Sequence, residues 1–504
     1  MQHEATVRAG RREWIGLAVL VLPCLLVAMD LTVLNLAVPH LSAALAPSSS
    51  QLLWIVDIYG FLIAGSLISM GTLGDRIGRR RLLLLGASAF GVASVLAAFS
   101  TTPAMLIAAR AVLGVAGATL MPSTLSLIRN MFHDPRQRTV AIGIWTTSFS
   151  IGGILGPLLG GLLLQYFWWG SVFLLAVPAM ALLLVLGPVL LPEFRLPEGG
   201  RFDLPSAALS LSAVLAVIFG IKRIAEHGPS GAAALAIAIG IVLGTVFVRR
   251  QRRLADPLID LGLFRAPAFS ASLVINTLAF LVMYGVFLFI PQYLQLVLGF
   301  TPLRAGLWTI PSSGAFIIGS LLTPVAVRWA RPSLVVTGGL LLSAAGFLLI
   351  TRVDGPSGFE AVIGGSIVLL LGLAPVYILA TDMIVASAPP ERAGAAGAMS
   401  ETSAELGGAL GIAILGSVGT AVYRGQMAAA VPAGVPADGT EAAQATLGGA
   451  LAVAERLSGA AGAELLARAR DAFVQGVESV AAVSAAVLVV TAIGAVIVLR
   501  SGDY

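Results

Sequence analysis

Fourteen apolar runs, each about as long as a membrane-crossing helix, alternate with short charged segments along this sequence. A helix needs roughly 20 apolar residues to cross the hydrocarbon core of a bilayer. Because 58% of the 504 residues are hydrophobic and 11% are charged, a soluble core could not bury the apolar surface. The sequence therefore predicts an all-α polytopic membrane protein with fourteen transmembrane helices. The runs are 14–38, 52–72, 82–100, 103–128, 139–164, 167–191, 204–221, 231–248, 267–290, 304–327, 333–351, 358–386, 393–422 and 476–499.

An even number of crossings places both ends of the chain on one side of the membrane, and the arginines indicate which side. With the N-terminus in the cytoplasm, the inside segments hold 21 arginines, and the outside segments hold eight basic residues, including Lys222 and Arg223. Cytoplasmic loops carry the excess of Lys and Arg. We therefore expect a multi-pass protein of the cell inner membrane with both termini cytoplasmic. The charges lie singly between apolar runs, so we expect a lipid-embedded monomer that binds no nucleic acid.

Five ionisable residues lie away from the ends of the apolar runs, namely Asp30, Asp57, Arg110, Glu401 and Glu405. Such residues face the bundle interior and pair with other polar groups. At 1.5 Å of helix per residue, Asp30, Asp57 and Arg110 lie roughly 13, 9 and 10 Å below the outer helix ends. Arg110 is therefore expected to pair with one of the two aspartates. Glu401 and Glu405, four residues apart, share one helix face. A structural hydrogen bond or a solvated helix end is the alternative for each acid.

The segment 71–81, "GTLGDRIGRRR", joins the second and third runs. Its glycines permit close helix approach and a tight turn. Asp75 can pair with arginines or with a helix N-terminus across a domain interface, which would make a latch that opens and closes. The alternative is an ordinary basic cytoplasmic loop. The latch residues expected here are Gly71, Asp75, Arg76, Gly78 and Arg79.

The segment 151–163, "IGGILGPLLGGLL", places small or kinking residues along one helix. They are Gly152, Gly156, Pro157, Gly160 and Gly161. Such a helix is pliable and packs closely against its neighbours. A generic glycine-rich packing face would explain the glycines, but not Gly-Pro followed by Gly-Gly.

These segments, with Arg110 before small residues in the fourth run and "DLTVLNLAVP" from Asp30 in the first, resemble the fourteen-span drug–proton antiporters of the major facilitator superfamily. The resemblance covers nearly the whole chain. It implies a six-helix bundle in residues 1–191, an inserted helix pair in 192–266, and a second six-helix bundle in 267–499 with an external loop at 425–475. One departure is that the corresponding region of the second half, "TPVAVRWARP", has arginines but no acid.

The resemblance implies proton-driven export of lipophilic cations such as ethidium, quaternary ammonium compounds, acriflavine and fluoroquinolones, and hence a role in antibiotic resistance. It implies that proton and drug are coupled at Asp30, Asp57, Arg110, Glu401 and Glu405. Aromatic side chains near carboxylates suit flat cations. Those expected to line the cavity are Tyr59, Tyr284, Phe287, Trp308 and Tyr377.

Other kinds of chemistry lack their motifs in this sequence. There is no phosphate-binding GxxxxGK[ST] loop, no HExxH and no GxSxG, so we expect no ATP, no enzyme activity, no metal and no cofactor beyond the proton gradient. A proton-coupled transporter of an endogenous metabolite or lipid is the alternative function. A membrane sensor or enzyme is disfavoured because no cytoplasmic loop is long enough for a soluble domain. In 425–475 we expect one or two amphipathic helices; the alternative there is a flexible insert.

Overall fold

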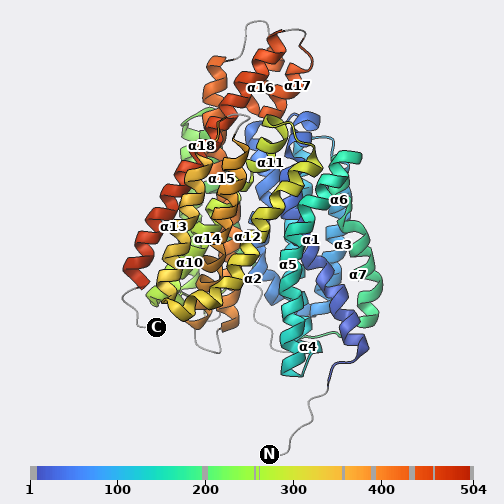
Figure 1. Cartoon of the computed structure of the whole chain (residues 1–504). Coiled ribbons are helices and arrows are strands. Elements are labelled where there is room, and N and C mark those ends of the chain that lie inside the picture. Colours follow the sequence, from blue (N-terminus) through green and yellow to red (C-terminus); the bar gives the residue numbers. More distant parts are fainter. Residues whose placement is uncertain are drawn as a thin grey trace, which may run out of the picture.

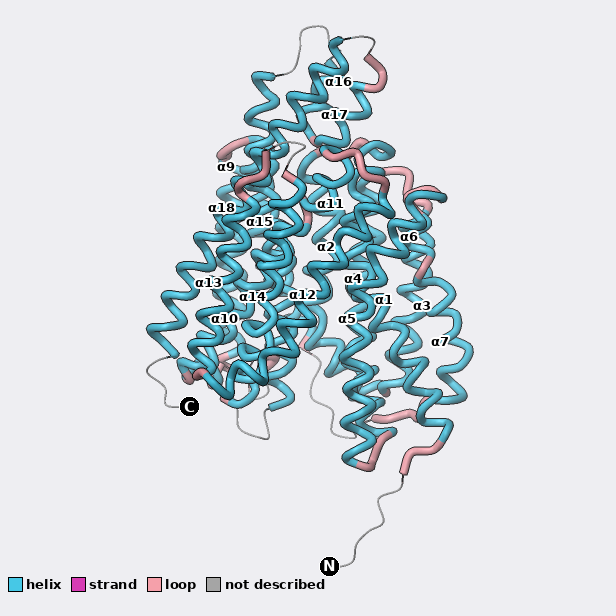
Figure 2. Tube along the Cα trace, in the orientation of Figure 1, coloured by secondary structure: helices cyan, strands magenta, loops and turns pink. Residues whose placement is uncertain are grey.

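The computed structural model describes residues 8–195, 203–254, 257–259, 261–354, 358–387, 393–430, 437–457 and 460–499. This part of the chain is helical throughout its regular structure and contains no strand (Figures 1 and 2). Fourteen helical segments within it are long and apolar enough to cross a membrane. The predicted fold class and the predicted number of spans are therefore confirmed.

The helices that make up the first part of the chain are α1 (Arg11–Leu45), α2 (Ser49–Ile77), α3 (Arg79–Ala98), α4 (Pro103–Met131), α5 (Pro135–Tyr166), α6 (Ser171–Leu174), α7 (Ala176–Leu190), α8 (Leu204–His227) and α9 (Gly231–Gln251). Those of the second part are α10 (Pro267–Phe287), α11 (Ile290–Gln292), α12 (Pro302–Trp329), α13 (Pro332–Ile350), α14 (Phe359–Ala386), α15 (Ala393–Ala430), α16 (Ala437–Ala445), α17 (Leu447–Ala454) and α18 (Ala460–Leu499).

Two groups of helices pack mainly among themselves. In the first group α1 packs on α5, α2 on α4, and α3 on α4 and α7. In the second, α13 packs on α14 and α18, α10 on α15, and α12 on α14. We call these groups the N-half and the C-half. Buried apolar side chains from both halves form one continuous core.

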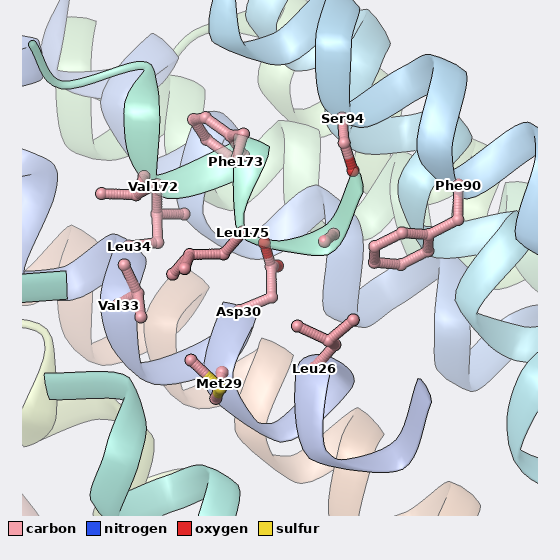
Figure 3. A pocket seen from close by; sticks show the side chains of 11 residues that line it. Leu26, Met29, Asp30, Val33, Leu34, Phe90, Ser94, Val172, Phe173 and Leu175 are labelled. Carbon is pink, nitrogen blue, oxygen red and sulfur yellow. The ribbon is translucent and has the colours of Figure 1, made fainter. Parts of the chain in front are cut away.

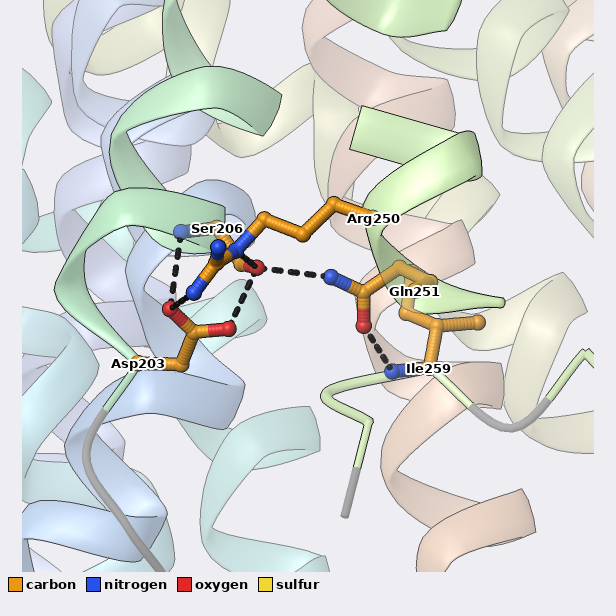
Figure 4. A network of polar contacts seen from close by, with 5 residues as sticks. All are labelled: Asp203, Ser206, Arg250, Gln251 and Ile259. Atoms are coloured by element: carbon orange, nitrogen blue, oxygen red, sulfur yellow. Dashed lines mark hydrogen bonds and ion pairs between the residues drawn. The ribbon is translucent and has the colours of Figure 1, made fainter. Parts of the chain in front are cut away.

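The inserted helices α8 and α9 pack against each other, and α8 also contacts α2 of the N-half and α15 of the C-half. A polar network joins the start of α8 to the end of α9 (Figure 4). Arg250 donates hydrogen bonds to Asp203 and Ser206, and Gln251 links Ser206 to the main chain of Ile259. Burial raises the pKa of the Asp203 carboxyl, but the hydrogen bonds from Arg250 and Ser206 outweigh it and leave this pKa below its ordinary value. The network is therefore charged at neutral pH.

The two halves touch near the face opposite the chain ends. The main chains of α5 and α12 are so close there that a Cβ added to Gly161 would lie 2.8 Å from Leu303 Cα. Gln295 of the C-half donates a 2.9 Å hydrogen bond to the carbonyl of Leu36 in α1. Towards the face that carries the start of α1 and the end of α18, α5 and α12 diverge (Figure 1). The halves are thus closed together on one face of the molecule.

Two short helices, α16 and α17, cover the closed face (Figure 1). The Ser49 hydroxyl donates to the carbonyl of Ala445, and Tyr423 donates to that of Ala443. The helices expected in 425–475 are present, but they pack on α1, α15 and α18. The helices continue beyond the bounds 422 and 476 predicted for these spans, since α15 ends at Ala430 and α18 begins at Ala460. Both helices continue past the length that a bilayer requires.

Candidate functional site

A cavity of about 380 Å³ lies between the two halves, and we call it the central cavity. Its walls come from α1, α4 and α5 on one side and from α10, α12, α14 and α15 on the other. The lining is apolar and aromatic, with a few polar groups and two carboxylates. The polar, aromatic and acidic residues of this lining include Asn35, Trp145, Phe149, Phe280, Tyr284, Phe287, Phe316, Tyr377, Glu401 and Glu405.

Glu401 and Glu405 both line the central cavity from α15, as their spacing predicts. The hydroxyl of Tyr377 donates a 3.3 Å hydrogen bond to Glu401 Oε1. The side-chain amide of Asn276 in α10 bonds the carbonyl of Ser400, which fixes the neighbouring turn of α15. No salt bridge of the described residues includes either glutamate. A cation in this cavity would therefore meet carboxylates whose charge is not already balanced by an adjacent base.

Aromatic rings surround the two glutamates. The ring of Phe280 stacks on Tyr284 with centroids 6.1 Å apart and meets the edge of Tyr377 at 5.2 Å. Two of the five aromatic residues predicted for the cavity are not among those that line it. Tyr59 is fully buried beneath the guanidinium of Arg110, and Trp308 packs on Phe359 at the outer part of α12. The helix of Trp308, α12, does line the cavity, whereas α2, which carries Tyr59, contributes no residue to its lining.

Arg110 forms an ion pair with Asp30. The guanidinium lies 2.7 Å from Asp30 Oδ2 and also donates to the carbonyls of Ile55 and Val56 in α2. Its side chain is 1% exposed and that of Asp30 is 15% exposed. The sequence left Asp30 and Asp57 open as partners, and the structure selects Asp30.

Asp30 faces a cavity of its own. This space of about 20 Å³ lies within the N-half and is lined by Asp30, Phe90, Ser94 and Phe173, among other residues. In Figure 3 the carboxylate of Asp30 lies amid apolar side chains from α1, α3 and α6 and from Leu175, which precedes α7. Two and five residues further along α1, Thr32 and Asn35 line the central cavity instead. The aspartate and the two glutamates thus occupy separate spaces, although the sequence analysis treats them as one set.

Asp57 has a partner that the sequence analysis missed. Lys222 Nζ lies 2.6 Å from Asp57 Oδ2, and both side chains are fully buried. The ammonium also lies 3.7 Å from the centre of the Trp54 ring. The assignment of Lys222 to an outer loop is wrong, because α8 continues to His227 and carries the lysine inside the bundle. Only Ile224 and Ala225 are apolar between Arg223 and Glu226, so the apolar pattern gave no clear signal that the lysine lies inside the bundle.

The segment 71–81 stays within the N-half in this conformation. Asp75 forms an ion pair with Arg79 one turn away, and Gly78 makes the turn into α3 with a φ of 109°, which a side chain would disfavour. Arg80 donates hydrogen bonds to carbonyls at the end of α7. The expected contact of Asp75 across the interface is absent from the described residues, because α2 and α15 meet nearer the opposite face.

The glycines of 151–163 serve two packing faces of α5. Gly152, Gly156 and Gly160 lie against α1, where a Cβ at Gly156 would be 3.2 Å from the carbonyl oxygen of Met29. Gly161 lies against α12. One helix therefore touches both the helix that carries Asp30 and the other half of the molecule. Pro157, between these faces, lines the central cavity.

The sequence is similar to those of known proteins over nearly its full length. A family model described as Major Facilitator Superfamily matches residues 20–412. The chain is 46% identical to the multidrug efflux pump LfrA of Mycolicibacterium smegmatis, over 97% of this chain and 96% of the relative. It is 36% identical to the methyl viologen resistance protein SmvA of Salmonella typhimurium, over 92% and 93% of the two chains.

Solved structures share the arrangement of helices. A bacterial homolog to the human lysosomal transporter Spinster, in an inward-facing and unoccupied conformation, matches with a TM-score of 0.66 over 98% of both chains at 19% identity. The nucleoside transporter NupG matches with a TM-score of 0.61 over 95% of this chain and 98% of that one, at 13% identity. At these identities the likeness concerns the fold alone.

Proposed function

The chain belongs to the Major Facilitator Superfamily, and on that premise we propose that it is a multidrug exporter that exchanges lipophilic cations for protons. Its relatives include a multidrug efflux pump and a methyl viologen resistance protein, and they match nearly its full length. The substrate class we propose comprises flat or bulky cations such as ethidium, acriflavine, quaternary ammonium compounds and fluoroquinolones.

The observation that carries this proposal is the pairing of two carboxylates with an aromatic wall in the central cavity. Glu401 and Glu405 supply negative charge at membrane depth, and Tyr284, Phe287 and Tyr377 supply faces for stacking. Aromatic faces attract cations more strongly where water is excluded. A cavity of about 380 Å³ falls in the range of small-molecule sites. A polar endogenous metabolite would need more hydrogen-bonding groups than this largely apolar wall offers.

In the cycle we propose, a cation and a proton compete for the glutamates. A cation enters from the cytoplasm and pairs with the deprotonated carboxylates. After the halves rock and open outward, protonation of Glu401 or Glu405 removes the attraction and releases the cation. The ligand can drive the exchange only because its affinity differs between the protonated and deprotonated states. The Asp30–Arg110 pair, in its separate cavity, would exchange a proton without direct contact with cargo.

We propose that the face carrying the chain ends is cytoplasmic and that the protein lies in the cytoplasmic membrane. The arginines of 76–81 lie on that face, as the excess of basic residues on the cytoplasmic side requires. The conformation, closed on the opposite face, then corresponds to a cavity facing the cytoplasm. In this state the exporter is ready to load cargo.

Ethidium accumulation in an efflux-deficient host tests the proposed function. Cells that express the protein should hold less ethidium than empty-vector cells, and a protonophore should remove the difference. Equal accumulation in both strains, with and without the protonophore, would show that the protein does not export this cation.

A further inference from the structure

Helix α8 brings a cation of its own into the N-half. A carboxylate and an aromatic face are the two groups that recognise an ammonium ion, and Asp57 and Trp54 supply both. Lys222 fills that site from the inserted helix pair. The same part of α8 contacts the C-half through apolar groups: Ile218 packs in a cluster with Ala409 and Ala413. The polar attachment of α8 is therefore to the N-half.

The pair is next to the central cavity. A space of about 30 Å³ is lined by Asp57 from α2, by Tyr284 from α10 and by Glu405 from α15. Glu405 and Tyr284 also line the central cavity. A space of this size can hold a water molecule that has polar partners. Water in this space would lie between the buried pair and the cargo site.

Lys222 can lose its proton, whereas the arginines, which are all the other basic side chains apart from the histidines, keep theirs. Lys222 is the single lysine among 30 lysines and arginines. An arginine keeps its proton in proteins, whereas a lysine in a buried site can release one. A permanent counter-charge for Asp57 could be an arginine, as Arg110 is for Asp30. The buried pair of α8 and α2 instead contains a base that can lose a proton.

We propose that Lys222 and Asp57 form a proton-exchange site that responds to cargo in the central cavity, an inference that rests on the proposed function. With the cavity free of cargo, the pair is an ammonium and a carboxylate. When a cation with one positive charge binds beside Glu405, the ammonium releases one proton through the water-sized space beside Asp57 to the cavity water. An amine and a carboxylate are left, and the net charge of the region is unchanged. The proton returns to the amine when the cation leaves.

The charges around the pair agree with this exchange. The ionisable groups facing it are Glu405 of α15, Tyr284 of α10 and Arg110 of α4, whose guanidinium bonds the carbonyls of Ile55 and Val56 beside Asp57. The basic residues of α9, Arg249 and Arg250, lie in the last turn of that helix, away from the pair. With Arg110 committed to Asp30, Glu405 is the further carboxylate next to the buried pair, and a cation bound to it cancels negative charge that helps to hold the proton on Lys222. A buried ammonium with less negative charge around it is costly inside a protein.

Because the chain has one lysine, its side-chain nitrogen can be observed alone. Protein labelled with 15N at the lysine side chain and held in lipid nanodiscs should give one side-chain signal. We expect the position of an ammonium in the free protein, and a shift to the position of an amine when ethidium saturates the site at constant pH. A signal that stays at the ammonium position throughout would overturn the proposal.

Transport in proteoliposomes gives a second readout. The first variant is Lys222→Arg, which keeps the charge but not the exchangeable proton. The second, for the case that arginine does not fit, combines Asp57→Asn with Lys222→Met, which removes both charges and leaves no unpaired charged group. Arg223→Lys, one residue further along α8, is the matched control. The steady-state ethidium gradient should change per pH unit by about tenfold less in both variants than in wild type, because one proton fewer is exchanged.

The outcomes separate this inference from the proposed function. If wild type builds an ethidium gradient and both variants show the same pH slope, then Lys222 is only a structural partner of Asp57. If wild-type protein builds no ethidium gradient from a pH gradient, the proposed function itself fails, and the inference falls with it.

Discussion

Asp30 and Glu405 are both carboxylates at membrane depth, yet only one of them faces the space where a cation would bind. Asp30 is held by Arg110 in a small cavity of the N-half. Glu405 lines the central cavity. A cation can therefore meet Glu405 directly, whereas Asp30 lies outside the central cavity. Substitutions of the two acids should differ in kind.

Replacement of Glu405 by Gln should strongly reduce export of monovalent cations while leaving the protein folded. The neutral amide keeps the shape but removes the charge that attracts the cation. We expect an export rate at least about tenfold lower, which corresponds to about 1.4 kcal/mol of lost cation binding, in an ethidium efflux assay. The control is Asp382→Asn, since Asp382 is exposed on α14. Equal rates for Glu405→Gln and wild type would exclude Glu405 from the cargo site.

Replacement of Arg110 by Met should destabilise the protein more than replacement of Asp30 by Asn. The Met variant leaves the Asp30 carboxylate and the carbonyls of Ile55 and Val56 without their donor, and loss of one partner of a buried pair costs about 3–5 kcal/mol. Thermal unfolding in detergent, followed by tryptophan fluorescence, should give a lower midpoint for Arg110→Met. If both variants unfold at the same temperature, the pair is not the main support of this layer.

At the residue scale, the sequence was informative about depth and silent about rotation. It indicated that Arg110 lies level with Asp30 and Asp57, but the choice between them depends on which face of each helix turns inward. Lys222 was missed because its partner is 165 residues away. The charge of Lys222 was interpreted as the end of the transmembrane span, although a lysine that is paired with an acid can lie inside a span.

At the scale of elements, α5 is the helix that couples the two halves. Three of its glycines lie against α1, and Gly161 lies against the main chain of α12. The sequence predicted close packing for 151–163, because small residues at four-residue spacing allow helices to approach. It could not predict the partners, since nothing in the spacing says which neighbour each face meets.

Replacement of Gly161 by Val should prevent closure of the face opposite the chain ends. A Cβ there would lie 2.8 Å from Leu303 Cα and from the carbonyl oxygen of Pro302, so α5 and α12 would have to separate. We expect loss of ethidium export with normal expression. Gly143→Val is the matched control, since nothing lies within 4 Å of a Cβ at Gly143 on the same helix. Export by the Gly161 variant at the control's rate would mean that this crossing tolerates separation.

At the scale of the whole molecule, the halves are in contact on one face and apart on the other. Transport by a rocking mechanism requires the contact on the closed face to break in each cycle. The contact between α2 and α15 can be tested at one position, because a Cβ at Gly60 would lie 3.4 Å from the Cβ of Ala409. This separation is close to that found in disulfides.

A disulfide between Gly60→Cys and Ala409→Cys should lock the protein closed on that face. Cys24, the native cysteine, is buried and should not interfere. Oxidation of the double variant should stop ethidium export, and a reductant should restore it, while each single variant should respond to neither. Continued export by protein that is fully cross-linked would show that this seam does not open during transport.

The central claim is that a proton gradient drives the export of cations through the central cavity. Purified protein in proteoliposomes, with ethidium and an imposed pH gradient as the single driving force, tests it most directly. The account predicts that ethidium accumulates on the acidic side, and that the gradient collapses when nigericin removes the pH difference. Ethidium accumulation that does not depend on the pH difference would contradict this claim. So would the absence of ethidium accumulation with wild-type protein under conditions in which a proton-driven control transporter is active.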